Sequence, residues 1–530
     1  MNAKISSIVL LLSCLSLSAC GGGKTEYNIV RPTFTPDYEN YGVSDEPSGI
    51  NMTYYSDIYS RGFSWLTNDL VTDTDLYLVK SDKGENADFS KAKYISGTSK
   101  KLVYDTNGNI TADGLETKKG SGNAEQVQIT SHKVHVENLE KGQAYSYKIG
   151  SSEGYAYGAF IVEDAKPKEI QAIHLSDAQT KDLSKTNVWR NTFTKAVDTA
   201  GKGLDMVLYN GDQFDQNNSS GNDKVPFRLF RYSKAYDVIQ DYKFDIAYMS
   251  SSGNHEPSSP YSHYLMSDIN YAGFDYKGAY YSYDYDFAHF AVLNTNTIDD
   301  TQINWLKSDL DNASNAKWKI VMMHISPYST GDHSNKSENQ EIVQKLTPIF
   351  SSKHVDLVLQ AHDHTYNKTK PYKWDAAGYT ETWNNEDVVN LAPETETKNS
   401  IVYDKNPNGT YYVTTGAAGH RQGASESDGI WAEVVNDNGT WKGLRSDKTF
   451  LDNKYKIELG SIKYDNSYEP YTFSSYTSDQ HYEVGDLATG NVNSPMFGVL
   501  NISKNTLSYN VYTANGTDVK LFDSLDVLKD

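Results

Sequence analysis

The chain has 530 residues, too many for a single hydrophobic core, and this length predicts two or three domains. Its formal net charge of −20 argues against nucleic acid as a partner, because phosphate backbones are bound by basic surfaces. An acidic composition of this kind suits the surface of an exported protein.

The first 20 residues predict a secretory signal. Lys4 precedes an apolar stretch over residues 8–17 that is too short to span a membrane, and Cys20 follows small residues at the expected cleavage point. This ending resembles a bacterial lipobox, which implies that Cys20 carries the lipid that anchors the mature protein outside the cytoplasm to a bacterial cell membrane. The alternative is an ordinary cleaved signal with an incidental cysteine. Residues 21–49 are polar and contain prolines, which predicts a tether.

Residues 50–165 predict an all-β sandwich. Short alternating segments, such as residues 63–67 and 76–79, are bounded by turn signals and have no helical pattern between them. Leu139, Gly142, Tyr145 and Tyr147 follow the arrangement L-x-x-G-x-x-Y-x-Y. This arrangement resembles the late strands of a fibronectin type III-like domain.

From residue 166 to residue 530 the pattern changes to alternating strands and helices. Apolar runs predict buried strands at residues 170–175, 204–209, 245–249, 319–323 and 355–359. Amphipathic spacing predicts helices at residues 187–200, 227–242, 301–310 and 340–350. This alternation predicts an α/β domain, in which ligands bind outside the carboxyl ends of the strands.

Two polar insertions interrupt the α/β domain, at about residues 370–408 and 423–491. Because long loops are usually functional or disordered, both are expected to border the substrate cleft. Residues 496–500, 507–512 and 519–522 alternate apolar and polar positions, and they predict terminal strands that close the second sheet.

Side chains that can bind a metal follow the predicted strands, and they are Asp177, Asp212, Asn254, His324, His362 and His364. The last two are separated by one residue, so both imidazoles point to one face if the backbone stays extended. Asp212 or Asn254 alone would be an ordinary turn residue. Five successive strand ends with such groups predict a metal site, since imidazole, carboxylate and amide groups bind transition metals.

This series resembles the calcineurin-like metallophosphoesterases, and residues 324–328 and 361–369 resemble two segments of the purple acid phosphatase-like branch. The resemblance covers about residues 50–528. It implies a four-layer α-β-β-α metallophosphatase sandwich, preceded by the fibronectin type III-like domain that is characteristic of the branch. It also implies a hydrolase that acts on phosphate ester bonds.

The resemblance further implies a binuclear centre. Asp212 would bridge two metal ions of iron, zinc or manganese, roughly 3.5–4 Å apart. Asp177 and His364 would bind the first ion, and the second would be bound by Asn254, His324 and His362. The family pattern gives His255 the role of contacting the phosphate or protonating the leaving group, although a packed turn histidine is the alternative. Glu256 would orient His255.

The chain departs from the family pattern at three positions. Gln179 stands where many relatives carry the histidine of Asp-x-His, and it is either a weak ligand or a hydrogen-bond donor behind the ligands. Asp215 replaces the tyrosine of purple acid phosphatases, so no coloured iron–tyrosinate species is expected; Asp215 is either a metal ligand or a structural loop carboxylate. Ala361 replaces a glycine. His333 resembles a second substrate-facing histidine of the family, or is simply solvated.

The sequence therefore predicts an exported, lipid-anchored metallophosphoesterase that hydrolyses phosphate monoesters in the manner of an acid phosphatase. One alternative is a phosphodiesterase that uses the same site. Another is a non-enzymatic cell-surface binding protein on a retained metallophosphatase fold. Nothing in the sequence selects among nucleotides, sugar phosphates, phytate and phospholipid headgroups.

Overall fold

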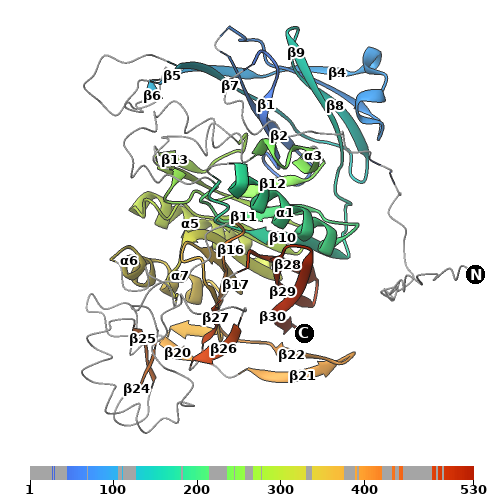
Figure 1. Cartoon of the computed structure of the whole chain (residues 1–530). Coiled ribbons are helices and arrows are strands. Elements are labelled where there is room, and N and C mark those ends of the chain that lie inside the picture. The colour runs from blue at the N-terminus through green and yellow to red at the C-terminus, as the bar shows by residue number, and fades with distance from the viewer. Residues whose placement is uncertain are drawn as a thin grey trace, which may run out of the picture.

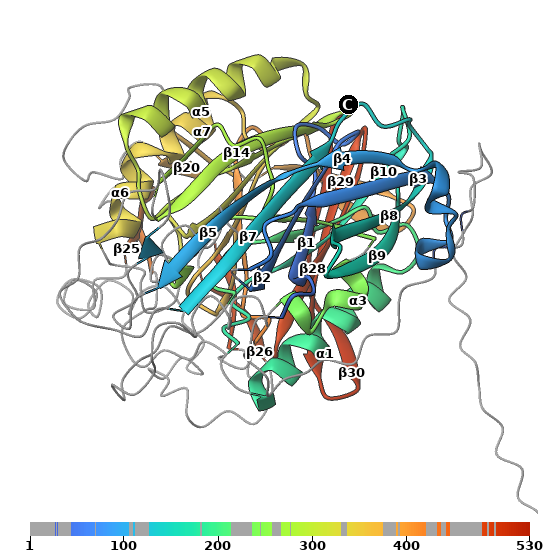
Figure 2. The same cartoon turned by 90° about the horizontal axis from the view of Figure 1, so that it is seen from above.

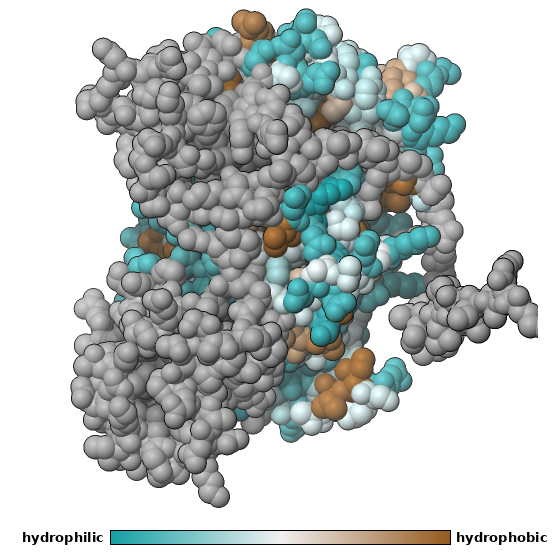
Figure 3. Space-filling model, viewed as in Figure 1, coloured by the Kyte–Doolittle hydropathy of each residue, from teal (hydrophilic) through white to brown (hydrophobic). Residues whose placement is uncertain are grey.

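The structure is a computed structural model (Figure 1). It describes residues 27, 29, 44–68, 70–104, 110–111, 127–180, 183–213, 236–243, 245–256, 267–275, 277–329, 337–374, 388–390, 393–419, 432–435, 441–445, 480–484, 487–491 and 494–530. In this part of the chain, no helix combines the length and apolar character needed to cross a membrane. Hydrophilic residues dominate the described surface in Figure 3, and hydrophobic ones occur in small groups.

The N-terminal region contains two antiparallel sheets, as the sequence predicts. One sheet has the strand order β1 (Ser48–Thr53), β2 (Arg61–Asn68), β7 (Val127–Val136), β5 (Thr98–Tyr104) and β6 (Ile110–Thr111). The other has the order β4 (Lys93–Ser96), β3 (Asp75–Lys80), β8 (Ala144–Ser151) and β9 (Gly154–Ile161). Their shared core includes Phe63, Trp65, Tyr147 and Phe160. The fibronectin type III-like assignment itself stays a prediction.

The region that follows contains two two-stranded sheets, β19 (Tyr372–Trp374) with β20 (Val388–Asn390) and β24 (Ala432–Val435) with β25 (Trp441–Arg445), and two larger sheets. One contains, in order, β12 (Ala247–Ser250), β11 (Met206–Tyr209), β10 (Glu169–Leu175), β28 (Met496–Ser503), β29 (Thr506–Asn515), β30 (Asp518–Leu528), β22 (Ile401–Lys405) and β21 (Glu394–Lys398). The other contains, in order, β13 (Gly273–Asp275), β14 (Gly278–Tyr285), β15 (Ala288–Val292), β16 (Trp318–Ile325), β17 (Leu357–Ala361), β23 (Tyr411–Thr415), β18 (Tyr366–Thr369), β27 (Leu487–Asn491) and β26 (Gln480–Val484).

Side chains that alternate between the two faces of each strand pack one face against the other large sheet and the opposite face against helices. In β16, Trp318, Ile320 and Met322 enter the core between the two large sheets, and Val321 and Met323 face the helices outside. Helix α1 (Leu183–Ala200) covers the outer face of the first large sheet. Helices α5 (Asp300–Asn312), α6 (Ser337–Lys345) and α7 (Thr347–Ser352) cover the second. The predicted four-layer α-β-β-α sandwich is confirmed.

The predicted helices differ from the observed ones in two places. Residues 340–350 belong to two helices, because Pro348 lacks the backbone N–H that would continue α6, and it lies in the first turn of α7, where that N–H is not needed. Most of the predicted helix at residues 227–242 lies outside the described residues, and the described part contains α3 (Gln240–Lys243).

The terminal strands join the first large sheet, so the prediction that they close the second is wrong. Strand β28 runs antiparallel to β10, from the pair Glu169↔Ser503 to the pair His174↔Gly498. Strands β29 and β30 follow as antiparallel neighbours. Strand β11 occupies one edge of β10, so the other edge would have unpaired backbone N–H and C=O groups without β28. The terminal strands pair there because those groups need partners.

The described end of the first insertion lies away from the carboxyl ends of the central strands. Strand β22 pairs with β30 at Asp404↔Val527, and the registers of the intervening strands place this pair at the end of the sheet where β10 starts. Tyr372 pairs with Thr410, just before β23 begins. The expectation that residues 393–408 border the cleft is therefore wrong. Most of residues 423–491 lie outside the described residues, and their role stays a prediction.

The N-terminal sheets pack directly on the large sheets, and Figure 2 shows their strands in front of the central ones. Tyr54, which is 1% exposed, belongs to the core between the two large sheets and lies 5.7 Å from Tyr283 between ring centroids. Its hydroxyl donates to Glu163 at 2.6 Å, and Glu163 also pairs with buried Arg61 at 2.8 Å. Tyr54 therefore belongs to the hydrophobic core of the α/β region.

His289 of β15 is a buried imidazole held between two carboxylates. Its Nδ1 lies 2.8 Å from Asp284 and its Nε2 lies 2.8 Å from Asp309 of α5. Burial lowers the pKa of His289, but the two carboxylates outweigh it and raise the pKa from 6.5 to about 9.

We expect this clamp to make the free energy of unfolding depend on pH. Because the folded-state pKa of His289 lies above the unfolded value, the stabilisation is fully present below about pH 6.5 and is lost as the pH rises through about 9. It amounts to about 3 kcal/mol at most. Urea titrations between pH 6 and 10 should show this slope in the wild type and a smaller one in His289→Gln. Equal slopes would contradict the assignment.

Candidate metal centre

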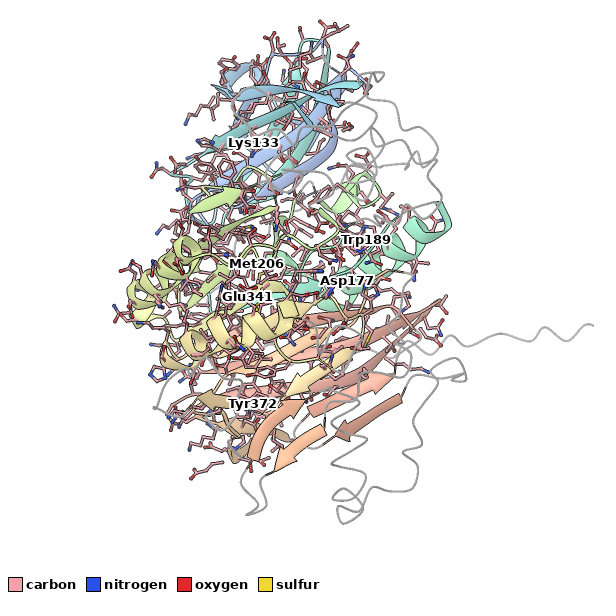
Figure 4. All side chains as sticks on the ribbon, turned by 90° about the vertical axis from the view of Figure 1, so that its left-hand side faces the viewer. Lys133, Asp177, Trp189, Met206, Glu341 and Tyr372 are labelled. Carbon is pink, nitrogen blue, oxygen red and sulfur yellow. The ribbon has the colours of Figure 1, made fainter. Side chains whose placement is uncertain are left out.

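The six predicted ligands meet where the carboxyl ends of two sets of parallel strands face each other. Strands β10, β11 and β12 are mutually parallel, and so are β15, β16, β17 and β23. Asp177, Asp212 and Asn254 follow strands of the first set, and His324, His362 and His364 lie at the ends of strands of the second. In Figure 4, Asp177 lies in the middle of the molecule, between the N-terminal sheets that carry Lys133 and the end that carries Tyr372.

The two histidines that follow β17 are placed by a turn. Strand β17 ends at Ala361, and both His362 (φ 82°) and His364 (φ 51°) have left-handed backbones. The expectation that an extended backbone aims both rings at one face is therefore wrong. Asp177 (φ 53°) and Asp212 (φ 55°) have the same conformation, which costs about 1–2 kcal/mol for each non-glycine residue and is typical of functional sites.

Three buried side chains converge at the centre of this edge. Asp212, His324 and His362 each present one ligand atom, and these atoms all lie within 4.8 Å of one another. The three residues are 0%, 0% and 7% exposed. A carboxylate with two imidazoles in this geometry suits a transition-metal ion.

The contacts of His324 leave one of its ring nitrogens directed at the other predicted ligands. Its Nδ1 lies 2.6 Å from the carbonyl oxygen of Asn210, which accepts the N–H and leaves Nε2 directed into the centre. Nε2 lies 2.9 Å from Oδ1 of Asn254 and 3.4 Å from Oδ1 of Asp212. A neutral ring that donates from Nδ1 leaves a lone pair on Nε2, and this lone pair can bind a cation, either a proton or a metal ion.

Electrostatics supports the same conclusion. Burial lowers the pKa of His324, but the carboxylates of Asp212 and Asp177 raise it to about 10. Burial also opposes the ionisation of Asp212, yet the imidazoles of His255, His324 and His362 hold its pKa well below its usual value. The centre is therefore an anionic carboxylate surrounded by groups that bind protons or metal ions.

Asp177 and His364 form a second group beside the first. Oδ1 of Asp177 lies 3.3 Å from Nε2 of His364, and Oδ2 accepts the backbone N–H of His362 at 3.4 Å. Asp177 is 1% exposed, and within the described residues its Oδ1 receives no hydrogen bond. A buried carboxylate oxygen without a hydrogen bond is costly unless a cation, here either a protonated His364 or a metal ion, lies beside it.

Glu256 connects the ends of β11 and β12. Its carboxylate accepts the backbone N–H groups of Asp212 (2.9 Å), Gln213 (2.8 Å) and Gly253 (2.5 Å). Burial and the neighbouring Asp212 raise the pKa of Glu256 to about 7. Gly253 is required here because a Cβ would lie 2.2 Å from Oδ1 of Asp212. Glu256 thus fixes the backbone of Asp212, and its predicted role in orienting His255 stays a prediction.

His255 lies at the partly open side of the centre. Its side chain is 16% exposed, and its Nε2 lies 3.7 Å from Oδ2 of Asp212. Its backbone N–H donates to Oδ1 of Asp212 at 2.8 Å. This places one titratable group next to the carboxylate and within reach of solvent.

Two residues that the sequence did not single out support the ligands. Asn210 holds His324 through its carbonyl oxygen, and its Nδ2 donates to the carbonyl oxygen of Met323 at 3.1 Å. Tyr209, at the end of β11, accepts the backbone N–H of Ala178 at 2.8 Å. Tyr209 could have been identified from the sequence, because it is a tyrosine at the end of an apolar strand. Asn210 could not, because its contact to His324 uses a main-chain carbonyl, which every residue has. Asp215, His333 and Cys20 lie outside the described residues.

Comparison with known proteins agrees with this geometry. The family model described as Calcineurin-like phosphoesterase matches residues 171–366. The chain is 27% identical over 317 residues to acid phosphatase type 7 of Mus musculus, and 28% over 315 residues to that of Homo sapiens. Each match covers 54% of this chain and 64% of the relative, so the chain spans less than two-thirds of the relatives' length.

A solved structure shares the fold. The purple acid phosphatase PPD1 from yellow lupin seeds superposes with a TM-score of 0.57 at 13% sequence identity, over 92% of this chain and 75% of that one. At this identity, the likeness concerns the fold alone.

The two groups of side chains lead us to expect that His362→Ala and His364→Ala lose different metal ions. His362 belongs with Asp212 and His324, whereas His364 contacts Asp177. Metal analysis of each purified variant, loaded with one equivalent and then two equivalents of Mn²⁺ and probed by electron paramagnetic resonance, distinguishes the two sites. Loss of the same ion from both variants would show that the pair binds one metal.

Proposed function

We propose that this chain, whose residues 171–366 form a calcineurin-like phosphoesterase domain, is an exported hydrolase that cleaves phosphate monoesters with two metal ions. The observation that carries the proposal is the convergence of Asp212, His324 and His362 within 4.8 Å, with Asp177 and His364 beside them. Two of the relatives are named acid phosphatases, and this similarity is our reason for proposing phosphate monoesters, and not diesters, as the substrate of this chain.

The residues present fit two metal ions. Asp212 belongs to the first group and has two carboxylate oxygens, so one oxygen could bind an ion held with His324 and His362 while the other reached an ion held by the second group. Asp177 and His364 offer an oxygen and a nitrogen on one side, and Asn254, His324 and His362 offer one oxygen and two nitrogens on the other. Such mixed ligands suit iron, zinc or manganese. When bound, the ions would activate the attacking water and neutralise charge on the phosphate oxygens.

The other residues have roles that do not involve binding a metal. His255, partly exposed beside Asp212, is placed to bind a phosphate oxygen or to give a proton to the departing alcohol. Glu256 keeps the backbone of Asp212 and Gly253 in place through its three amide contacts. The Asn210 carbonyl fixes the tautomer of His324. Burial of most of the site excludes bulk water and strengthens these interactions.

We expect protein without residues 1–20 to release nitrophenol from nitrophenyl phosphate in a metal-dependent manner. Asp212→Asn should lower this activity on the order of 100-fold or more, because an amide is a poor bridge between cations. Asp311→Asn, a change at a side chain that is 61% exposed, is the matched control and should retain activity.

The bis-nitrophenyl ester separates the two enzymatic alternatives. A monoesterase should turn over nitrophenyl phosphate faster than the bis-ester, and the opposite order would favour a phosphodiesterase. Metal-replete protein that hydrolyses neither ester would refute the proposed function.

Export and lipid anchoring rest on the sequence of residues 1–20. In a bacterial host the full chain should incorporate labelled palmitate and sediment with membranes. Cys20→Ala should abolish both results, because the acylated thiol is missing. Ser18→Ala, which leaves the cysteine in place, is the control. Equal labelling of wild type and Cys20→Ala would show that Cys20 carries no lipid.

A further inference from the structure

Gln179 is attached to Asp212 through both its main chain and its side chain. Its backbone N–H donates to the carbonyl oxygen of Asp212 at 3.1 Å, and its Nε2 donates to Oδ2 of the same residue at 3.3 Å. The residue is 2% exposed and has a left-handed backbone with φ 41°. A strained, buried residue with two bonds to one partner has little freedom to point elsewhere.

The neighbouring backbone keeps Gln179 in this position. The N–H of Asp177 donates to the carbonyl oxygen of Gly211 at 3.0 Å, and that of Thr180 donates to Gln213 at 3.2 Å. Together with the Gln179 bond, these contacts pair residues 177–180 with residues 211–213. The segment after β10 therefore lies in fixed register beside the segment after β11. This register places the side-chain amide of Gln179 next to Oδ2 of Asp212.

We propose that Gln179 is a positioning residue that orients the Asp212 carboxylate for metal binding by donating from Nε2 to Oδ2. This inference rests on the proposed function, because it concerns the same centre. A carboxylate oxygen has two acceptor positions, so Oδ2 can accept from Gln179 and still bind a cation. If Gln179 bound a metal through Oε1, it would be a ligand and not a positioning residue, and the two roles are separated by the cobalt measurement below.

The choice of an amide also has a chemical consequence. The carboxamide does not titrate between pH 3 and 10, whereas the histidine found in the Asp-x-His pattern is protonated as the pH falls. Protonation of residue 179 therefore does not disrupt this contact as the pH falls. The contact also withdraws electron density from Oδ2 without adding a negative charge to the centre.

The test is metal binding by the metal-free protein. Gln179→Met keeps the length of the side chain but removes the donor, and calorimetric titration with Mn²⁺ should show about 10–100-fold weaker affinity with unchanged stoichiometry. Gln179→Asn keeps the amide but shortens it, and should weaken binding similarly. Gln240→Met is the matched control: Gln240 is also buried, and it accepts the N–H of Ile50 in the N-terminal sheets. Its Mn²⁺ affinity should equal that of the wild type.

Visible absorption of the Co²⁺-loaded proteins separates positioning from ligation. A positioning role leaves the intensity of the cobalt bands of Gln179→Met equal to that of the wild type, because no ligand is lost. Stronger bands, which indicate a lower coordination number, would show that Gln179 is a ligand and would overturn the proposal. Unchanged Mn²⁺ affinity in both variants would overturn it too. If wild-type protein bound no metal, the proposed function itself would fail, and this outcome is distinct from the others.

Discussion

The structure depends on a pair of hydrogen bonds that join the ends of its two large sheets. Nδ1 of His324 donates to the carbonyl oxygen of Asn210, and the side-chain amide of Asn210 donates to the carbonyl oxygen of Met323. Both bonds are buried, where an unmade hydrogen bond costs about 1–3 kcal/mol, so the two sheets are fixed in register at this edge. Because Asp212 follows Asn210 by two residues and His324 follows Met323 directly, the same bonds determine the distance between ligands contributed by different sheets.

The buried carboxylates of Asp177 and Asp212 lower the free energy of unfolding, and packing elsewhere in the fold offsets this loss. Backbone strain comes from the left-handed conformations of Asp177, Asp212, His362 and His364. The carboxylates raise the pKa of His324, so that its protonated form is favoured. The apolar core between the sheets and the amides that surround Glu256 hold these groups in place.

The sequence predicts the central strands, because buried strands are continuous apolar runs, and it predicts that the six side chains lie near one another, because they follow the carboxyl ends of those strands. It does not predict that a turn orients His362 and His364. Two histidines separated by one residue can lie side by side either on an extended strand or in a turn, so their spacing does not distinguish the two backbones. The sequence also misplaces β28, because a strand's own pattern does not identify the sheet edge that it completes. The role of Asn210 leaves no trace in the sequence, since it depends on a main-chain carbonyl.

Tyr54 has a consequence for how this protein can change over evolution. Its ring fills space between Tyr283 and Tyr285 at the end of the core, while its hydroxyl and Arg61 share one carboxylate, Glu163. The N-terminal sheets are therefore not an interchangeable module. An unrelated β-sandwich put in their place would leave a void of aromatic size and uncover part of the core, unless it carried its own equivalent of this tyrosine. Recombination at this boundary is constrained, and the two regions are expected to be inherited together.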